Sequence, residues 1–242
     1  MRDGESSPHF NILSKYNSKL KGYEKSFIPI LNFSSHNRFA DIPIPTNDDW
    51  EILTNQYYLG SCRSNYINIR DHINTNFDTK IPTAIFRGSS TGCGTIIKNN
   101  PRLKIAYMSK RYNRHPIYGS ETNNGVPFLD ARITSFTKSV KKHYSDNYIE
   151  WIDPDSLHIR MGNKLPVGQI SNYKYVINIA GNIAAFRLTL ELSYNSVILL
   201  VQSEFSLWYQ HLLKPWIHYV PVKSDLSDLM QRISWCRSHD YK

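Results

Sequence analysis

The last third of the chain alternates short apolar runs with segments of helical spacing, and this alternation constrains the fold more than any other feature. The expected strands cover residues 174–181, 196–202 and 217–222, and the expected helices cover residues 184–194, 204–213 and 226–236. Strands that are separated by helices run parallel, because each crossover returns the chain to the same end of the sheet. The pattern therefore predicts an open α/β fold, a parallel sheet flanked by helices.

This fold brings the residues that follow each strand to one edge of the sheet. In open α/β sheets, ligands bind where the carboxyl ends of the strands meet the helices that follow. We therefore expect Gly181, Ser203, Glu204 and Ser224 to lie at the mouth of one crevice.

A loop rich in glycine and hydroxyl side chains follows an earlier apolar run. The expected strand 83–86 leads into the loop RGSSTGCG (87–94), and helical spacing resumes over residues 100–111. The loop lacks the Gly-Lys-Ser/Thr ending of a Walker loop and does not fit the Gly-x-Gly-x-x-Gly pattern. Its N–H and O–H groups can bind a phosphate, or the loop can simply turn the chain.

A second glycine, Gly181, ends the strand 174–181 and is followed by small residues and by Arg187. Backbone N–H groups at the start of a helix attract anions. Arg187, about one turn into the expected helix, can hold a diphosphate through two parallel hydrogen bonds. The alternative is that Gly181 relieves a tight turn and that Arg187 pairs with a surface carboxylate.

The N-terminal part contains fewer signals. Residues 27–33 have the pattern of a short strand, and Thr46 or Asn47 can cap a helix whose first turn carries Asp48 and Asp49. Acidic residues are favoured at this end of a helix, so the tandem aspartates need no further explanation.

The charge balance favours an anionic partner. The chain has 29 Lys and Arg against 20 Asp and Glu, a net charge of +9, and an isoelectric point near 9.4. Nucleic acid, a membrane surface and a phosphorylated small molecule all fit such a balance. We expect no nucleic-acid partner, because the chain shows neither an RNP-like nor a helix-turn-helix pattern.

The metal-binding and disulfide signals are weak. Cys62, Cys93 and Cys236 are odd in number, and no Cys-x-x-Cys spacing or cysteine–histidine cluster occurs. Asp153 and Asp155 imitate an Asp-x-Asp metal motif, but the proline between them is equally typical of a turn. We therefore expect no metal site and no disulfide framework.

Targeting signals are not apparent. The N-terminus lacks the charged-then-apolar pattern of a signal peptide, and the C-terminus does not match a retrieval tetrapeptide. The longest apolar run, 196–202, is far shorter than the roughly 20 residues that a membrane-spanning helix needs. The expectation is a chain without a transmembrane segment, located in the cytoplasm or in a compartment that these signals do not indicate.

Four stretches, taken together, resemble one enzyme family. They are FRGSSTG (86–92), YKYVINIAGNIAAFRLTLEL (173–192), NSVILL (195–200) and LKPWIHYVPVKSDLSDL (213–229). Their order and spacing resemble the capsule-associated and lipopolysaccharide-modifying glycosyltransferases, a family that includes protein O-glucosyltransferases. The resemblance extends from about residue 27 to residue 235.

The resemblance implies a GT-B-like architecture with a Rossmann-type lobe at residues 81–242 and a reduced, acceptor-side portion at residues 1–80. It also implies an inverting, metal-independent transfer of glucose or xylose from a UDP-sugar to a hydroxyl on a protein or glycan. The UDP-sugar is then a co-substrate, and no further cofactor is expected.

The resemblance further implies a donor-binding set. Arg187 takes the position of the diphosphate-binding arginine, Ser89 falls where the family contacts the nucleotide diphosphate, and Glu204 matches a carboxylate that holds the ribose. The full set is Ser89, Thr91, Gly181, Asn182, Ile183, Ala184, Ala185, Phe186, Arg187 and Glu204.

The catalytic base implied by the resemblance is an aspartate in an Arg-Asp pair that precedes the strand 27–33. Arg2-Asp3 is the pair in that place, so Asp3 is the candidate base, whereas Asp41 matches a different family aspartate. Thr95 stands where the family has an arginine. The family's usual N-terminal part and C-terminal helices are expected to be missing. The alternative function is therefore a non-catalytic UDP-sugar- or glycan-binding remnant.

Overall fold

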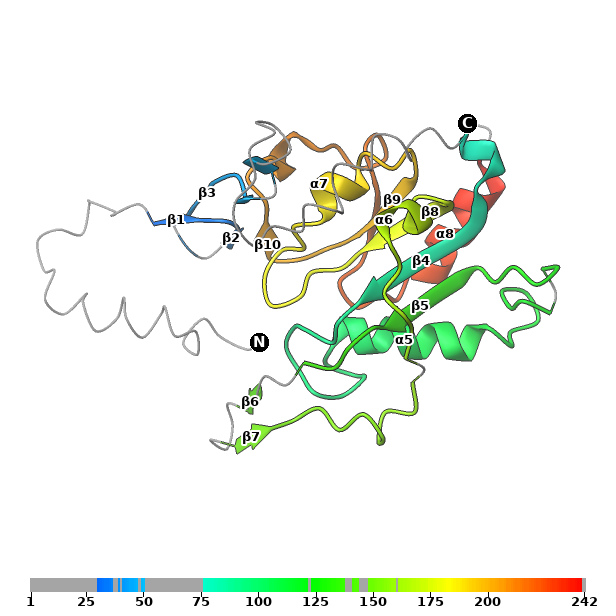
Figure 1. Cartoon of the computed structure of the whole chain (residues 1–242), viewed down its shortest axis with the longest axis horizontal. Coiled ribbons are helices and arrows are strands. Elements are labelled where there is room, and N and C mark those ends of the chain that lie inside the picture. Colours follow the sequence, from blue (N-terminus) through cyan, green and yellow to red (C-terminus); the bar gives the residue numbers. More distant parts are fainter. Residues whose placement is uncertain are drawn as a thin grey trace, which may run out of the picture.

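A five-stranded parallel sheet forms the centre of the computed structural model (Figure 1), which describes residues 30–36, 39, 41–47, 49–50, 76–121, 123–137, 141–143, 148–159 and 161–240. Its strands are β4 (Ile81–Gly88), β5 (Leu129–Ile133), β8 (Tyr173–Asn178), β9 (Val197–Val201) and β11 (Val220–Val222). The spatial order is β11-β9-β8-β4-β5, and every neighbouring pair is parallel. The predicted parallel α/β sheet is thus confirmed, and the arrangement is consistent with a Rossmann-like fold.

The strand order contains one reversal point. Counted along the chain, the five strands are arranged 2-1-3-4-5, the doubly wound order that flavodoxin-like folds share. After β4 the chain moves to β5 at one edge and then crosses to β8 on the other side of β4. The carboxyl ends of β4 and β8 therefore diverge into loops on opposite faces, which leaves a crevice between them.

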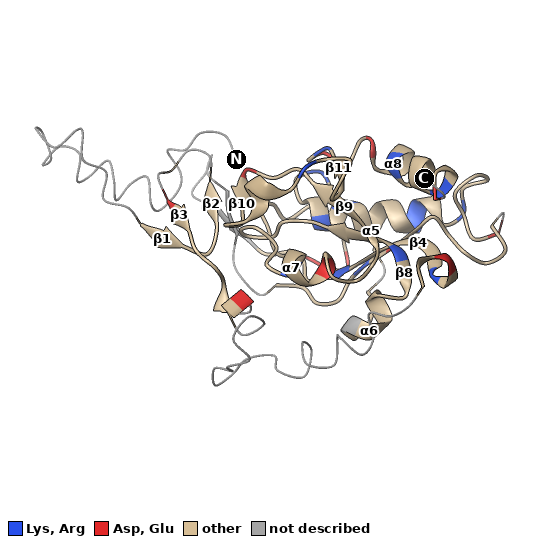
Figure 2. Cartoon of the chain, turned by 90° about the horizontal axis from the view of Figure 1, so that it is seen from above, with Lys and Arg blue, Asp and Glu red and all other residues tan. Residues whose placement is uncertain are grey.

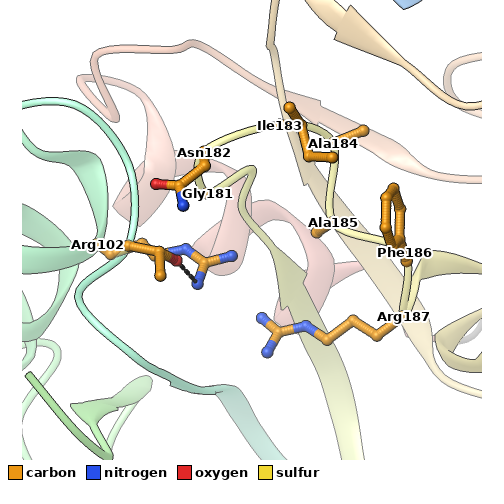
Figure 3. A pocket seen from close by; sticks show the side chains of 9 residues that line it. Arg102, Gly181, Asn182, Ile183, Ala184, Ala185, Phe186 and Arg187 are labelled. Atoms are coloured by element: carbon orange, nitrogen blue, oxygen red, sulfur yellow. Dashed lines mark hydrogen bonds between the residues drawn. The ribbon is translucent and has the colours of Figure 1, made fainter. Parts of the chain in front are cut away.

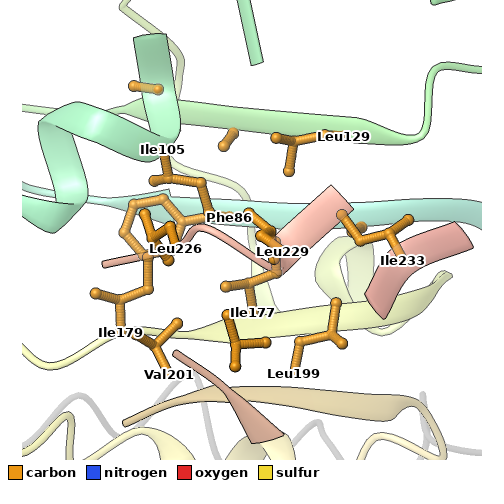
Figure 4. Close-up of a cluster of buried hydrophobic side chains, with 14 of the residues drawn as sticks. Phe86, Ile105, Leu129, Ile177, Ile179, Leu199, Val201, Leu226, Leu229 and Ile233 are labelled. Carbon is orange, nitrogen blue, oxygen red and sulfur yellow. The ribbon is translucent and has the colours of Figure 1, made fainter. Parts of the chain in front are cut away.

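Helices cover both faces of the sheet, and alternate strand residues pack toward opposite sides. One face, toward α5 (Pro101–Tyr112) and α8 (Leu229–Ser238), buries the side chains drawn in Figure 4. The other face lies against α7 (Leu188–Glu191). The first face contributes Phe86, Tyr175, Ile177 and Leu199, and the second contributes Ile85, Val176, Ile198 and Leu200.

The start of α5 is set by a buried cap. The Asn100 side chain accepts hydrogen bonds from the N–H groups of Arg102 and Leu103, at 3.0 and 3.2 Å. Pro101 occupies the first turn, where its missing N–H costs nothing. Asn100 also donates to the carbonyls of Ser90 and Gly94, so the cap ties the helix to the glycine-rich loop before it.

Two of the predicted helices are wrong, one in its extent and one in its type. The helix predicted at 184–194 is reduced to the four residues of α7, and 181–187 form a loop in which Gly181 N–H donates to the Ile183 carbonyl at 3.0 Å. The helix predicted at 204–213 is instead β10 (Phe205–Ser206) followed by the 3₁₀ turn η3 (Gln210–Leu212). Antiparallel pairing of β10 with β2 (Ser35–His36) overrides the helical spacing there.

The N-terminal segment packs beside α7 and β10 (Figure 1). It contains β1 (Leu31–Asn32), which overlaps the predicted strand 27–33, and β3 (Ile42–Pro43), which pairs with β1 in parallel. Thr46 caps the next turn as predicted, since its Oγ1 accepts the Asp49 N–H at 3.2 Å and its own N–H donates back to the Asp49 carboxylate.

The remaining described elements are short. They are η2 (Phe77–Thr79), β6 (Lys141–His143), β7 (Tyr148–Glu150) and α6 (Val167–Ile170). Within the described ranges no helix is long and apolar enough to cross a membrane.

Candidate functional site

A pocket of about 290 Å³ lies at the reversal point of the strand order, where the loops after β4 and β8 meet (Figure 3). The loop after β4 leads into α5, and the loop after β8 leads into α7. The pocket is lined by Thr91, Arg102, Gly181, Asn182, Ile183, Ala184, Ala185, Phe186 and Arg187. Two arginines from different elements therefore face one hollow.

Arg102 braces the two loops against each other. From the first turn of α5 its guanidinium donates to the carbonyls of Ser89, Ile179 and Ala180 at 2.8–3.1 Å. It also donates to Thr91 Oγ1 at 2.6 Å. Burial, reinforced by the charge of Arg187 and opposed by that of a nearby glutamate, lowers the pKa of Arg102 to about 9. The group therefore remains a cation at neutral pH.

Arg187 is held more loosely, and its guanidinium points toward that of Arg102 (Figure 3). Its Nη1 donates to the Arg87 carbonyl at 2.6 Å, and its guanidinium carbon lies 5.1 Å from the centre of the Phe86 ring. About 31% of the side chain is exposed. Among the described residues Nη2 of Arg187 has no hydrogen-bond partner, so this donor is available to a ligand.

Arg187 also faces a buried carboxylate, Glu191, one turn later in the chain. Its Nε lies 2.8 Å from Glu191 Oε1, an ion pair whose N–H is not aligned for a hydrogen bond. The other oxygen of Glu191 accepts from Asn178 Nδ2 at 2.6 Å. Burial raises the pKa of Glu191, although Arg187, the Asn178 hydrogen bond and Arg102 act in the opposite direction.

The two loops approach so closely that only small residues fit. Asn182 Oδ1 accepts the Gly92 N–H at 2.9 Å, and Gly92 has a φ of +110°, which favours glycine. A Cβ on Gly181 would lie 2.6 Å from Thr91 Oγ1 and 3.1 Å from Arg102 Nη2. Gly181 therefore allows the contact between the loops that forms the pocket.

One wall of the pocket is apolar. It consists of residues 183–186, and the Phe186 ring meets the ring of Phe33 edge to face at 6.2 Å between centroids. Phe33 follows β1, so the N-terminal segment reaches the rim of the pocket. A ligand with an anionic part and a flatter, less polar part matches these two walls.

The structure gathers most of the predicted donor-binding residues in this pocket, namely Thr91 and Gly181 through Arg187. Ser89 does not line it, but the Ser89 carbonyl binds Arg102. Glu204 lies outside it and contacts His36 of β2, with 3.1 Å between Oε2 and Nε2. Ser203 and Ser224, expected at the same mouth, do not line the pocket either.

Two further predictions have different outcomes. Asp3, the candidate base, lies outside the described residues. Thr95, which stands where an arginine was expected, is buried, and the second cation of the pocket comes from Arg102 instead.

Arg102 was not predicted from the sequence as a residue of the pocket. The available signal was a basic residue in the first turn of a helix, where acidic residues are favoured, directly after a glycine-rich loop.

The acidic groups considered for metal binding do not gather. Asp153 Oδ1 accepts the Asp155 N–H at 3.1 Å, the hydrogen bond of a local turn. Over the part of the chain that the structure describes, no group of three or more His, Cys, Asp or Glu side chains is arranged to hold a metal ion.

Comparison of the sequence with known proteins identifies related families and proteins. The sequence profile described as glycosyl transferase family 90 matches residues 13–242. An uncharacterized protein of Invertebrate iridescent virus 6 is 36% identical, over 97% of this chain and 22% of its own length. Protein O-glucosyltransferase 2 of Danio rerio is 26% identical over 88% of this chain and 36% of its own. Protein O-glucosyltransferase 3 of Mus musculus is 37% identical over 88% and 35%. The chain thus spans between a fifth and two fifths of the length of these relatives.

Proposed function

Because the chain belongs to glycosyl transferase family 90, we propose that it binds a UDP-sugar in the pocket between the β4–α5 and β8–α7 loops. The proposed reaction transfers glucose or xylose from UDP to a hydroxyl on a protein or glycan acceptor. Residues 81–242 act as the donor lobe of a GT-B-like enzyme, and residues 1–80 serve the acceptor side. The names of the relatives, protein O-glucosyltransferases, support glucose as the sugar and a protein as the acceptor.

The observation that carries the proposal is the convergence of Arg102 and Arg187 on one pocket at the reversal point of a doubly wound sheet. Ligands of such sheets bind at this point. Arginine suits a diphosphate because its planar donors pair with two phosphate oxygens at once. Arg187 has a donor left for this purpose, and the apolar wall at 183–186 accommodates the less polar parts of a nucleotide-sugar.

The same groups serve the chemical step that we propose. The acceptor oxygen bonds to the anomeric carbon while the bond from that carbon to the diphosphate oxygen breaks, so the configuration inverts. The diphosphate gains negative charge as it leaves, and the two guanidinium groups stabilise that charge without a metal ion. The proton of the acceptor hydroxyl passes to a carboxylate, for which Asp3 is the candidate.

Calorimetry with UDP tests the donor site. We expect wild-type protein to bind UDP and Arg187→Ala to bind it about 10-fold to 150-fold more weakly, because a charge-assisted hydrogen bond contributes roughly 1.5–3 kcal/mol. Arg114→Ala is the matched control. It removes one exposed arginine beyond the far end of α5, so UDP affinity should not change. Circular dichroism establishes that both variants fold.

Two results would contradict the donor site: absence of UDP binding to the wild type, or equal affinities for the wild type and Arg187→Ala. Release of UDP from UDP-glucose and UDP-xylose, in the presence of acceptor, then tests catalysis. Asp3→Asn should abolish release but keep UDP binding. Binding without any release in the wild type would instead identify a non-catalytic nucleotide-sugar-binding protein.

A further inference from the structure

Glu191 is a buried carboxylate beside the pocket, and the proposed binding of a diphosphate does not use it. Only 5% of its side chain is exposed. One oxygen lies 2.8 Å from Arg187 Nε, and the other accepts from Asn178 Nδ2 at 2.6 Å. A buried negative charge next to an anion-binding group opposes anion binding, so its presence there needs a reason.

The charges around the pocket do not balance. Two guanidinium groups face it, from α5 and from the start of α7, and Glu191 is the carboxylate that acts on both. The phenols of Tyr194 and Tyr209 also interact with Glu191 and are neutral at physiological pH. Asp49 contacts α7 through Thr189 and acts on the same Tyr209 phenol. Figure 2 shows the acidic end of α7 near basic residues. One of the two cations is therefore compensated and the other is not.

Glu191 affects the net charge at Arg187 more than it affects the position of the Arg187 side chain. Arg187 Nη1 is fixed by the Arg87 carbonyl at 2.6 Å, and the guanidinium stacks 5.1 Å from the centre of the buried Phe86 ring. The Cα of Gly88 also lies close, since a Cβ built on it would be 3.4 Å from Arg187 Nη1. These contacts come from β4 and remain when Glu191 loses its charge.

We propose that Glu191 is the counter-charge of the pocket: it neutralises one of the two guanidinium groups and so keeps the affinity for a nucleotide diphosphate moderate. This inference rests on the proposed function and adds a means of regulating the same site. A pocket that held the diphosphate with two uncompensated cations would release the UDP product slowly. Protonation of Glu191 removes its negative charge, and the affinity for the diphosphate then increases.

The direction of the pH effect follows from this arrangement. Burial raises the pKa of Glu191, so its protonation begins at a higher pH than for an exposed glutamate. As the pH falls, Glu191 becomes neutral while Arg102 and Arg187 stay charged. Affinity for the diphosphate should therefore rise as the pH falls. Among the described residues no histidine lines the pocket, so none competes with this effect there.

The experiment is calorimetry with UDP-glucose between pH 8 and pH 5.5. UDP-glucose is the suitable probe because its diphosphate is esterified at both ends and keeps a constant charge over this range. Glu191→Gln removes the charge and retains the shape and an oxygen for Asn178. Glu121→Gln is the control, since Glu121 is exposed and does not line the pocket.

At pH 8 we expect Glu191→Gln to bind UDP-glucose about tenfold more tightly than the wild type, a conservative figure for one charge in a partly buried site. The wild-type affinity should increase toward pH 5.5, and the variant should lack that increase. Glu121→Gln should behave as the wild type does.

Equal or weaker binding by Glu191→Gln at pH 8 would overturn the inference. If that variant does not fold, the wild-type series decides, because an affinity that stays constant from pH 8 to pH 5.5 overturns it equally. A failure of the proposed function is distinguishable: the wild type would then not bind UDP-glucose at all, or Arg187→Ala would bind it as the wild type does.

Discussion

The segment from β4 to α5 and the segment from β8 to α7 each provide one arginine to the pocket, yet they hold it in different ways. Arg102 is 8% exposed and donates to four oxygens, three of them backbone carbonyls. Arg187 donates to one carbonyl and faces Glu191, and about a third of its side chain is exposed. Arg102 is therefore part of the hydrogen-bonded framework of the two loops, whereas the Arg187 guanidinium is partly exposed at the pocket.

This difference separates two roles that the same side chain can have. A guanidinium whose donors are used by carbonyls contributes its charge to the pocket and holds the loops together. One with a donor left can contact a ligand directly. The segment with Arg102 is a continuous strand, loop and capped helix. The segment with Arg187 contains a four-residue helix and depends on contacts from elsewhere in the chain.

The largest effect is expected from Arg102→Ala. This change leaves three backbone carbonyls and a hydroxyl without their donor, and we expect the free energy of unfolding to fall by about 3 kcal/mol. Arg187→Ala should cost only about 1 kcal/mol when it is made together with Glu191→Gln, which avoids an unpaired buried charge. Urea titration at pH 7 measures both. Equal losses in the free energy of unfolding would contradict the inference that Arg102, and not Arg187, holds the loops together.

Gly181→Ala tests the contact between the segments. Its Cβ would lie 2.6 Å from Thr91 Oγ1, so the Thr91 side chain or the loops must shift, at a cost of about 2 kcal/mol and with weaker UDP binding. Gly125→Ala is the comparison. It meets no atom within 4 Å and has a φ of +82°, so only a backbone cost of roughly 1 kcal/mol is expected, with unchanged UDP binding. Thermal unfolding and calorimetry measure the two effects. Unaltered UDP binding by Gly181→Ala would contradict the close contact.

The smallest effect concerns the support of α7 by the N-terminal segment. Thr189 Oγ1 lies 2.7 Å from Asp49 Oδ1 and 2.8 Å from the Tyr209 hydroxyl, and Asp49 Oδ2 also accepts from Trp208 Nε1. Thr189→Val should lower the free energy of unfolding by about 1 kcal/mol, and Thr189→Ser should restore most of it. Urea titration measures both. A loss as large as that of Arg102→Ala would mean that the second segment is as integral to the scaffold as the first.

Local sequence signals predicted the strands and the helix whose formation depends mainly on the residues within them. The strands β8, β9 and β11 lie in continuous apolar runs, which is the pattern of strands buried on both faces of a parallel sheet. Helical spacing over residues 100–111 predicted α5, and the structure shows that the Asn100 side chain caps its first turn. The order and spacing of four stretches, those around Ser89 and Gly181 and those at 195–200 and 213–229, indicated the family from the sequence alone.

The predictions that failed involve contacts between distant residues. The segment 204–213 has the spacing of a helix, but pairing of Phe205 with His36 and the bond from Trp208 to Asp49 draw it into another conformation. Arg102 lies 85 residues before Arg187 in the sequence, so no local pattern indicated that the two share a pocket.

The sequence alone determined the parallel α/β sheet, its main strands and the family, because each rests on periodicity or on the order of short motifs along the chain. Only the tertiary structure decided which loops meet, that Arg102 is the second cation, and that Glu191 compensates one charge. These depend on the crossover from one side of β4 to the other, which brings residues far apart in sequence within hydrogen-bond distance at the reversal point of the sheet.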